Sequence, residues 1–468
     1  METWFDALPD IIRNLSADTA TVDTGRARVP VNTYLVPSFD RDALQFSLPV
    51  LVSRRLTEEI GLDMRGSDGA ISAIIEGIKA AAEGDRRLGP LHGAGTGFPG
   101  RYRDTLEPCT IVHSDSAMGG CLWKPDTGNF ADNDGIHLTV CGALPHRPPD
   151  RMGIRGVADE LSGLFQATGE LVLRFPAGGL RKEWVNSLDQ KLARELLPER
   201  GLVSFIGDGS RPARGLTWLR CFHRVAGPKE GISVPFTCPP ALDPGELPLP
   251  ASGGCMTGLG IRRREVLAVT GSNAQGKTTF LEAVVAGQDD HAIGDGRERI
   301  LTVPGMALAQ GGSQGMGGED VSLFFRRLPP GLEGTPACVR GAGSSSLVMA
   351  SQIQRAVRCG APLLIFDEDT AAPNLLVPGC VQDGEVEVLS SLLARDPGAL
   401  GETALVFASG TLDILVAQAG RILVLRNHEA RAIAPREFRA RLAAHLRGVL
   451  RHLGDGEVEG RDPDRGRT

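Results

Sequence analysis

Residues 271–278 read G-S-N-A-Q-G-K-T and match the phosphate-binding pattern G-x-x-x-x-G-K-[ST]. An apolar run at 266–269 precedes this octapeptide, and a helix-like stretch at 279–285 follows it. A strand, a glycine loop and a helix, in this order, are the context that the pattern requires. Gly271 and Gly276 allow the loop to turn its N–H groups inward, and the helix adds its positive N-terminal end. The octapeptide therefore predicts a site for a nucleoside triphosphate.

Two side chains of the octapeptide have distinct predicted roles. Lys277 can reach the β- and γ-phosphates, and the Thr278 hydroxyl can ligate Mg²⁺. A chance glycine turn before a helix is the alternative, and the surrounding strand and helix argue against it. The residues of this segment predicted to bind nucleotide are Gly271, Ser272, Asn273, Ala274, Gln275, Gly276, Lys277, Thr278 and Thr279.

A second phosphate-site element is predicted at residues 362–368, which read P-L-L-I-F-D-E. An apolar run of this length is typical of a central parallel strand. Asp367, at its carboxyl end, can hold the Mg²⁺ shell, and Glu368 can orient and deprotonate an attacking water as general base. A strand that simply ends in two solvated acids is the alternative, which the Lys277 loop in the same chain disfavours.

An adjacent Asp–Glu pair is more typical of ABC-class ATPases than of G proteins or kinases. In that class the phosphate loop of one chain faces a serine–glycine segment of a second chain. Ser344, Ser345 and Ser346 precede a helical stretch at 347–358, and hydroxyls at a helix N-terminus are suited to bind phosphate. We therefore predict a contact in trans from these serines, with ordinary helix capping as the alternative.

Two further positions are candidates for the site. The glycine run at 310–318 is predicted to be a flexible loop, with Gln310 as a sensor of Mg²⁺ or water. Ser409 and Gly410 follow a predicted strand at 403–408, where ABC ATPases often carry a phosphate-sensing histidine. Serine can donate a hydrogen bond but carries no positive charge, which predicts slow hydrolysis.

Read together, these segments resemble the family of predicted ATPases of the ABC class. The most specific is 367–374, D-E-D-T-A-A-P-N, and the resemblance covers roughly residues 135–430, most strongly from 200 onward. It implies an ABC-type nucleotide domain that binds ATP and Mg²⁺, and ATP-dependent dimerisation, but no established substrate. The other resembling segments are 201–210 with Arg214, 256–261, 271–278 and 294–298.

Three positions depart from the family pattern. Gln275 stands where the family usually has histidine, which leaves binding intact because the loop acts through its backbone N–H groups. Leu347 and Val348 replace a threonine and a third serine, and Ala372-Pro373 replaces alanine-threonine. The last two departures bear on the contact in trans and on the efficiency of hydrolysis.

Composition and charge limit the class of protein. The chain of 468 residues is 41% hydrophobic, 23% charged and has a net charge of −7, which gives no global attraction to nucleic acid or anionic membrane. No run approaches the ~18 apolar residues of a membrane span, and the acidic N-terminus does not resemble a signal peptide. Nine scattered cysteines without a C-x-x-C pair indicate reduced thiols. We expect a cytoplasmic protein without membrane insertion.

The predicted fold class is α/β, with a P-loop NTPase ABC-type ATPase domain after an α+β N-terminal region. The predicted units are 1–245, 246–435 and a basic helix with a disordered tail at 436–468. Other predicted elements are a core-facing helix at 71–79, helices at 157–165 and 183–197, strands at 136–140 and 421–425, a hairpin turn at 262–264, a glycine loop at 93–97 and a proline-rich linker at 235–250.

The predicted function is an ATPase that dimerises around two ATP molecules, hydrolyses them slowly and couples this to a conformational change in the N-terminal region. The alternative is a nucleotide-gated RNA- or DNA-binding module with negligible hydrolysis, acting through the arginines and lysines of 174–224. Interleaved acids favour a solvated helix face for that strip. A subunit driving a separate membrane permease is less well supported, because that role leaves the large N-terminal half unexplained.

Overall fold

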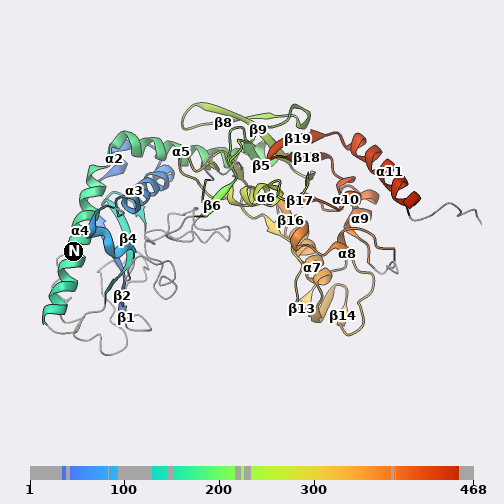
Figure 1. The fold of residues 1–468 in the computed structure, drawn as a ribbon, viewed down its shortest axis with the longest axis horizontal. Coiled ribbons are helices and arrows are strands. Elements are labelled where there is room, and N and C mark those ends of the chain that lie inside the picture. Colours follow the sequence, from blue (N-terminus) through green and yellow to red (C-terminus); the bar gives the residue numbers. More distant parts are fainter. Residues whose placement is uncertain are drawn as a thin grey trace, which may run out of the picture.

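The computed structural model describes residues 34–37, 43–82, 84–92, 129–145, 151–216, 223–225, 233–380, 384 and 386–452. Its elements form an N-terminal group and a larger group around the glycine loop, and α5 (Ala177–Leu196) reaches from one to the other (Figure 1). The predicted glycine loop at 93–97 and the tail beyond 452 lie outside the described residues. Among the described helices, none combines the length and the apolar character needed to cross a membrane.

A six-stranded sheet forms the centre of the larger group. Its strands are parallel except for the last, which runs antiparallel to its neighbour. In sheet order they are β12 (Ala307–Leu308), β16 (Leu363–Asp367), β17 (Ala404–Ser409), β10 (Val266–Thr270), β18 (Arg421–Arg426) and β19 (Glu429–Ile433). All residues of β17 are buried, as expected for a strand covered on both faces. The predicted strands at 266–269, 362–367, 403–408 and 421–425 are confirmed.

Helices cover both faces of this sheet. On one face, α6 (Lys277–Ala286) packs its apolar side chains against β10 and β17. The opposite face contacts a core built from α7 (Ser345–Arg358), α8 (Pro373–Leu376), α9 (Leu389–Arg395) and α10 (Asp413–Val416). The basic helix predicted after 435 is present as α11 (Pro435–His452).

The prediction of a flexible loop at 310–318 is wrong for its second half. Residues from Gln314 onward form β13 (Gln314–Glu319), which pairs with β15 (Cys338–Gly343), and β14 (Glu333–Thr335) completes this small sheet. The glycines fit because the strands pack closely: a Cβ added at Gly343 would lie 2.7 Å from the Met316 sulfur. Glycine-rich sequence hides such a strand, because it supplies almost no side-chain alternation.

A second, antiparallel sheet joins segments from both sides of the predicted boundary at 245/246. Its order is β11 (Ile300–Thr302), β5 (Leu202–Gly207), β9 (Gly254–Arg262) and β8 (Gly245–Leu249). The predicted linker at 235–250 is wrong, because η6 (Pro240–Leu242) and β8 lie within it. The turn at 262–264 is exposed as predicted, yet it makes no hairpin, because β9 and β10 belong to different sheets. The division of the chain into independent units stays a prediction.

The N-terminal group contains another antiparallel sheet covered by helices. Its predicted helix at 71–79 is confirmed within α3, whose four isoleucines are fully buried. The predicted helices at 157–165 and 183–197 fall within α4 and α5, and the predicted strand at 136–140 within β4. Its elements are β1 (Tyr34–Pro37), β2 (Ala43–Val52), β4 (Ile136–Pro145), β3 (Phe130–Ala131), α2 (Leu56–Ile60), η1 (Met64–Gly66), α3 (Ser67–Ala81), η2 (Arg86–His92) and α4 (Arg151–Arg174). Three short elements follow α5 in the chain: η4 (Pro198–Arg200), β6 (Arg214–Leu216) and β7 (His223–Val225).

Gly69 in α3 lies directly against α5, so its replacement tests how closely these two helices pack. A Cβ at Gly69 would lie 2.0 Å from the Glu183 carbonyl oxygen and 2.9 Å from the Ser187 Cβ. We expect Gly69→Ala to lower the free energy of unfolding by about 1–3 kcal/mol, the usual cost of overpacking. Thermal and urea unfolding measure this effect. Gly178→Ala in α5 is the control, since nothing lies within 4 Å of its Cβ position, and equal losses in both variants would contradict the close packing.

Candidate functional site

The glycine loop between β10 and α6 requires its glycines. Gly271 and Gly276 have φ angles of 147° and 93°, which L side chains rarely adopt. A Cβ at Gly271 would also lie 2.3 Å from the Leu425 carbonyl oxygen of β18. Ala274, with φ at 58°, completes the tight turn. The backbone therefore has the sharply curved form that turns successive N–H groups toward an anion at the start of a helix.

Lys277 and Thr278, the first residues of α6, connect the loop to the neighbouring strand end. The Lys277 Nζ donates hydrogen bonds to the carbonyl oxygens of Gly271 (2.9 Å) and Ser272 (3.0 Å). The Thr278 Oγ1 donates to Asp367 Oδ2 at 2.6 Å. Since β10, β17 and β16 are parallel neighbours, their carboxyl ends meet at one edge of the sheet. The structure thus brings together the predicted phosphate-binding lysine and the two predicted Mg²⁺ ligands.

Glu368 is held in place by the loop that follows β17. Its Oε2 accepts hydrogen bonds from the N–H groups of Gly410 and Thr411 (3.1 Å for Thr411), and its Oε1 accepts one from the Thr411 hydroxyl. Burial alone would raise the pKa of Glu368, but hydrogen bonds from the Thr411 side chain, the two N–H groups and Ser409 outweigh it and lower the pKa. The carboxylate is therefore ionised at neutral pH, as a general base requires.

The role of Thr411 was not predicted from the sequence. The segment Ser409-Gly410-Thr411 contains a second hydroxyl after the core strand, and this was the only available signal. Ser409, which was predicted to contact the nucleotide, is 1% exposed, and its Oγ accepts a hydrogen bond from the Leu412 N–H at 2.9 Å. Thr411 thus donates its hydroxyl to Glu368, and Ser409, whose side chain also lowers the pKa of Glu368, supports the same loop from within the core.

Replacement of Thr411 by valine is expected to raise the pKa of Glu368, because a hydrogen bond to its ionised form is lost while the Thr411 N–H remains. A ¹³C NMR titration of the Glu368 carboxyl measures the midpoint directly. Since the folded pKa is lowered, ionised Glu368 stabilises the fold above the ordinary carboxyl pKa, and this contribution disappears as pH falls through the lowered value. With Thr411→Val, the free energy of unfolding should therefore fall by a smaller amount when the pH is lowered through this range. An unchanged midpoint, matching that of the Thr403→Val control at the other end of β17, would contradict the assignment.

A cavity of about 480 Å³ lies beside the glycine loop. The loop and the start of α6 line it together with a turn before β6 and with Val234 and Phe236, and the Phe236 ring packs against Phe280 of α6 with their centroids 5.9 Å apart. The lining residues contributed by distant segments are Pro212, Ala213, Arg214, Val234, Phe236, Asp369, Leu425 and His428. The predicted site residues Asn273, Ala274, Gln275, Gly276, Lys277, Thr278 and Thr279 all line it. The cavity is large enough for a nucleotide and extends beyond the glycine loop.

The turn between β18 and β19 brings two unexpected residues to the loop. The Asn427 N–H donates to Gln275 Oε1, and the His428 Nδ1 lies 3.5 Å from the Cβ position of Gly276. Asn427 and His428 both have positive φ angles, 52° and 63°. No sequence signal pointed to His428, because only the pairing of β18 with β10 brings it near the glycine loop.

The remaining predicted contacts lie apart from this cavity. Gln310 is exposed just after β12, at the same sheet edge as Asp367, and the next residue, Gly311, donates its N–H to the Thr370 carbonyl at 2.7 Å. Ser344 and Ser345 are exposed at the start of α7. Ser346 is 8% exposed and donates to Asn374 Oδ1 at 2.8 Å, so its hydroxyl is engaged within the chain. None of the three serines is among the described residues that line the cavity.

The basic strip predicted at 174–224 is largely occupied by internal contacts. Several of its described cations bind carboxylates or backbone carbonyls of neighbouring elements: Arg181 to Ile60, Lys191 to Asp68 and Asp290, Arg194 to Asp290 and Gly287, Arg211 to Ser233, and Arg214 to Asp295. Arg214 and Arg194 are only 6% and 9% exposed in their side chains. These side chains therefore connect segments of the chain to one another and are engaged in internal contacts.

Comparison with known proteins adds a family match. The family model ABC_ATPase, described as a P-loop domain, matches residues 176–449. The Uncharacterized protein MJ1628 of Methanocaldococcus jannaschii is 38% identical over 384 residues, which cover 81% of this chain and 83% of that protein. The matched range begins at the start of α5 and includes every predicted nucleotide-binding residue.

Two solved structures show a weaker likeness. The chain cbiO1 from Clostridium perfringens, part of the ABC transporter complex cbiONQ, aligns with a TM-score of 0.29 and 19% identity over 42% of this chain and 87% of that one. A putative metal-chelate type ABC transporter in an inward-facing conformation aligns with a TM-score of 0.26 and 16% identity, over 40% of this chain and 79% of the other.

Proposed function

This chain belongs to the ABC_ATPase family of P-loop proteins, and we propose that it binds ATP, hydrolyses it slowly and couples binding to a movement of its N-terminal region. The observation that carries the proposal is the hydrogen bond between Thr278 and Asp367, which joins the glycine loop to the strand end that bears Glu368. A phosphate-binding loop, a pair of hard oxygen ligands and an ionised carboxylate thereby lie at one edge of the sheet. That combination is what phosphoryl transfer to water requires.

The residues at this edge fit Mg²⁺. A hydroxyl and a carboxylate are oxygen donors of the kind that Mg²⁺ prefers, and Thr278 Oγ1 lies 2.6 Å from Asp367 Oδ2. Thr278 and Asp367 would hold the ion, which when bound neutralises charge on the phosphate oxygens. Lys277 would exchange its contacts with Gly271 and Ser272 for the phosphates, adding a charge that the loop backbone cannot supply.

Glu368 supplies the base in this proposal. Its lowered pKa keeps it ionised, and its three hydrogen bonds from Gly410 and Thr411 fix the carboxylate so that one water can be oriented at the sheet edge. ABC ATPases often carry a histidine directly after this strand, and Ser409 and Gly410 supply no positive charge there. Slow turnover follows from this difference.

A second chain would complete the site. Ser344 is the N-cap residue of α7 but its side chain makes no capping hydrogen bond, and both Ser344 and Ser345 are exposed. Two free hydroxyls at a helix N-terminus are well suited to a phosphate, yet they do not line the cavity of their own chain. We therefore propose that α7 of one chain closes over the nucleotide of another, which gives a dimer around two ATP molecules.

Replacement of Ser345 by glutamate tests the closure in trans. A carboxylate at a helix N-terminus is compatible with the fold, but it would repel the γ-phosphate of the facing chain. In a Glu368→Gln background with MgATP, we expect light scattering to show a dimer, and addition of Ser345→Glu to return it to a monomer that still binds ATP. Ser322→Glu, an exposed serine away from the α7 N-terminus, should leave the dimer intact. A dimer that persists with Ser345→Glu would contradict this geometry.

Phosphate release from MgATP by the wild-type chain tests the hydrolysis. Sustained release above the buffer rate supports the proposal. If none occurs, ATP should still stabilise the fold, by about 2.7 kcal/mol at a hundredfold excess over its dissociation constant. That result would retain nucleotide binding and remove hydrolysis from the proposed function.

A further inference from the structure

The part of the cavity lining at residues 212–214 is built around Arg214. The Arg214 guanidinium donates to the carbonyl oxygens of Arg211 (3.0 Å) and Ala213 (3.1 Å), so the turn at 211–214 folds around its own side chain. The Arg211 N–H donates to the Gly296 carbonyl at 2.6 Å, and a Cβ at Gly296 would lie 2.7 Å from the Arg211 carbonyl oxygen. The turn is therefore packed directly on the segment 291–298.

An ion pair fastens this contact. The Arg214 Nη2 donates to Asp295 Oδ2 at 2.6 Å, and the two side chains are 6% and 14% exposed. Burial would raise the pKa of Asp295, but the adjacent His291 and the positive charges of Arg214 and Arg297 lower it, so the carboxylate stays ionised. Buried pairs contribute little net stability, because desolvation offsets the attraction. The pair does, however, make the position of the turn depend on the position of Asp295.

His291 receives contacts from two sides of the nucleotide site. Its Nδ1 lies 3.0 Å from Asp295 Oδ2, the same oxygen that binds Arg214. Its Nε2 lies 3.0 Å from the carbonyl oxygen of Ala286, the last residue of the helix that begins at Lys277. The cavity wall and the helix behind the glycine loop therefore meet at one fully buried imidazole.

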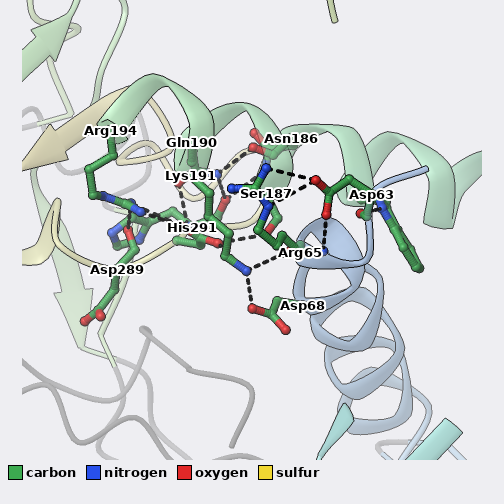
Figure 2. A network of polar contacts seen from close by, with 12 residues as sticks. Asp63, Arg65, Asp68, Asn186, Ser187, Gln190, Lys191, Arg194, Asp289 and His291 are labelled. Atoms are coloured by element: carbon green, nitrogen blue, oxygen red, sulfur yellow. Dashed lines mark hydrogen bonds and ion pairs between the residues drawn. The ribbon is translucent and has the colours of Figure 1, made fainter. Parts of the chain in front are cut away.

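The backbone of His291 is bound by α5. Gln190 accepts from the His291 N–H and donates to its carbonyl, both at 2.8 Å, and Asn186 donates to the same carbonyl at 2.8 Å (Figure 2). Beside this contact, Asp290 accepts a hydrogen bond from Ser187 at 2.7 Å and pairs with Arg194. These hydrogen bonds and the ion pair join α5 to residues 290 and 291 of the larger group, and α5 also packs against the N-terminal group.

The same helix is fixed to the N-terminal group. Lys191 pairs with Asp68 (Figure 2). The Trp184 Nε1 donates to the Asp63 carbonyl at 2.8 Å, and Glu195 pairs with Arg65 at 3.0 Å. Trp184 is fully buried, and Gly69 of α3 lies against the α5 backbone. The helix α5 is therefore bound directly to η1 and α3.

We propose that the turn at 211–214 is the nucleoside-binding wall of the site, and that Arg214, Asp295 and His291 transmit its occupancy through α5 to the N-terminal group. The inference rests on the proposed nucleotide binding and adds which part of the ligand is sensed. The glycine loop takes the phosphates, and the base and ribose lie against residues 212–214. Contact there restrains the turn, and the shared Asp295 oxygen passes that restraint to His291 and α5.

Hydrogen exchange of the wild-type chain with two ligands tests this division. ADP fills both walls without a γ-phosphate to close a dimer, whereas pyrophosphate fills the glycine loop alone. With both ligands shown by calorimetry to be saturating, we expect ADP to slow amide exchange severalfold in 271–278, 291–295 and 177–196. Pyrophosphate should slow it in 271–278 only. Equal protection of α5 by the two ligands, or none with ADP, would overturn the inference. Binding of neither ligand would overturn the proposed function as well.

A matched pair of variants tests the route. Asp295→Asn removes one carboxylate charge from the pair with Arg214, and Glu265→Gln removes one from the buried pair with Arg421 at the opposite end of the sheet. At saturating ADP, Asp295→Asn should lose the ADP-dependent protection of α5, and Glu265→Gln should keep it. Protection retained in Asp295→Asn would overturn the route. If Asp295→Asn does not fold, Asn186→Ala, which removes a single hydrogen bond to His291, should reduce the same protection, and full retention would be equally contradictory.

Discussion

Replacement of Lys277 by alanine is expected to weaken the binding of MgATP by about a hundredfold, which corresponds to about 3 kcal/mol for the loss of charge-assisted hydrogen bonds. The side chain reaches across the glycine loop to the carbonyl oxygens of Gly271 and Ser272, so it already lies above the loop where phosphate oxygens would bind. The loop backbone is set by Gly271 and Gly276 and should not change.

Isothermal titration calorimetry measures this loss, with turnover followed in parallel. Lys182→Ala is the control, since Lys182 is an exposed lysine on α5 and its removal changes the net charge equally. Equal affinities of wild type and Lys277→Ala would contradict the assignment of the glycine loop as the phosphate site.

Replacement of Glu368 by glutamine is expected to lower turnover by about 10²–10⁴-fold, the usual contribution of a general base, while ATP binding persists. The amide keeps the shape of the carboxylate and can still accept hydrogen bonds from Gly410 and Thr411, so the loop after β17 should hold its position. Only the ability to accept a proton from water is lost. Uncleaved ATP should then accumulate on the enzyme and favour the closed dimer.

Single-turnover phosphate release separates this effect from product release. Glu387→Gln serves as the control, because Glu387 is a carboxylate paired with Arg395 away from the sheet edge. Turnover by Glu368→Gln within a factor of a few of wild type would remove Glu368 from the role of base.

The parts of the site that follow the chain locally could be predicted from the sequence. The strand, loop and helix around 271–278, and the strand that ends at Asp367, each depend on a short apolar run and its neighbours. The glycine loop and Asp367 lie at the same edge of the sheet because β10, β17 and β16 pair in parallel. The strands β8 and β13 were not predicted, because their proline and glycine residues interrupt the alternation of apolar and polar side chains that identifies a strand in a sequence.

The parts that depend on distant segments could not be predicted. Arg214 follows β5 in the chain, and Phe236 precedes β8. The pairing of β5 with β9 brings the segments that carry these two residues to the cavity beside the glycine loop. His428 arrives through the pairing of β18 with β10, and Thr411 gains its role only because β17 lies beside β16. The position of a residue in the sequence does not show which distant segments will lie beside it. The roles of Arg214, Phe236, His428 and Thr411 therefore became visible only once the strand order was known.

We propose above all that the glycine loop and the end of β16 hold a nucleoside triphosphate with Mg²⁺. A crystal structure of the wild-type chain with Mg²⁺ and a non-hydrolysable ATP analogue tests it most directly. We expect the triphosphate within the loop at 271–278, Mg²⁺ on Thr278 and Asp367, and the base against the turn at 212–214. An empty loop at a saturating concentration of the analogue, or an analogue bound elsewhere on the chain, would contradict it.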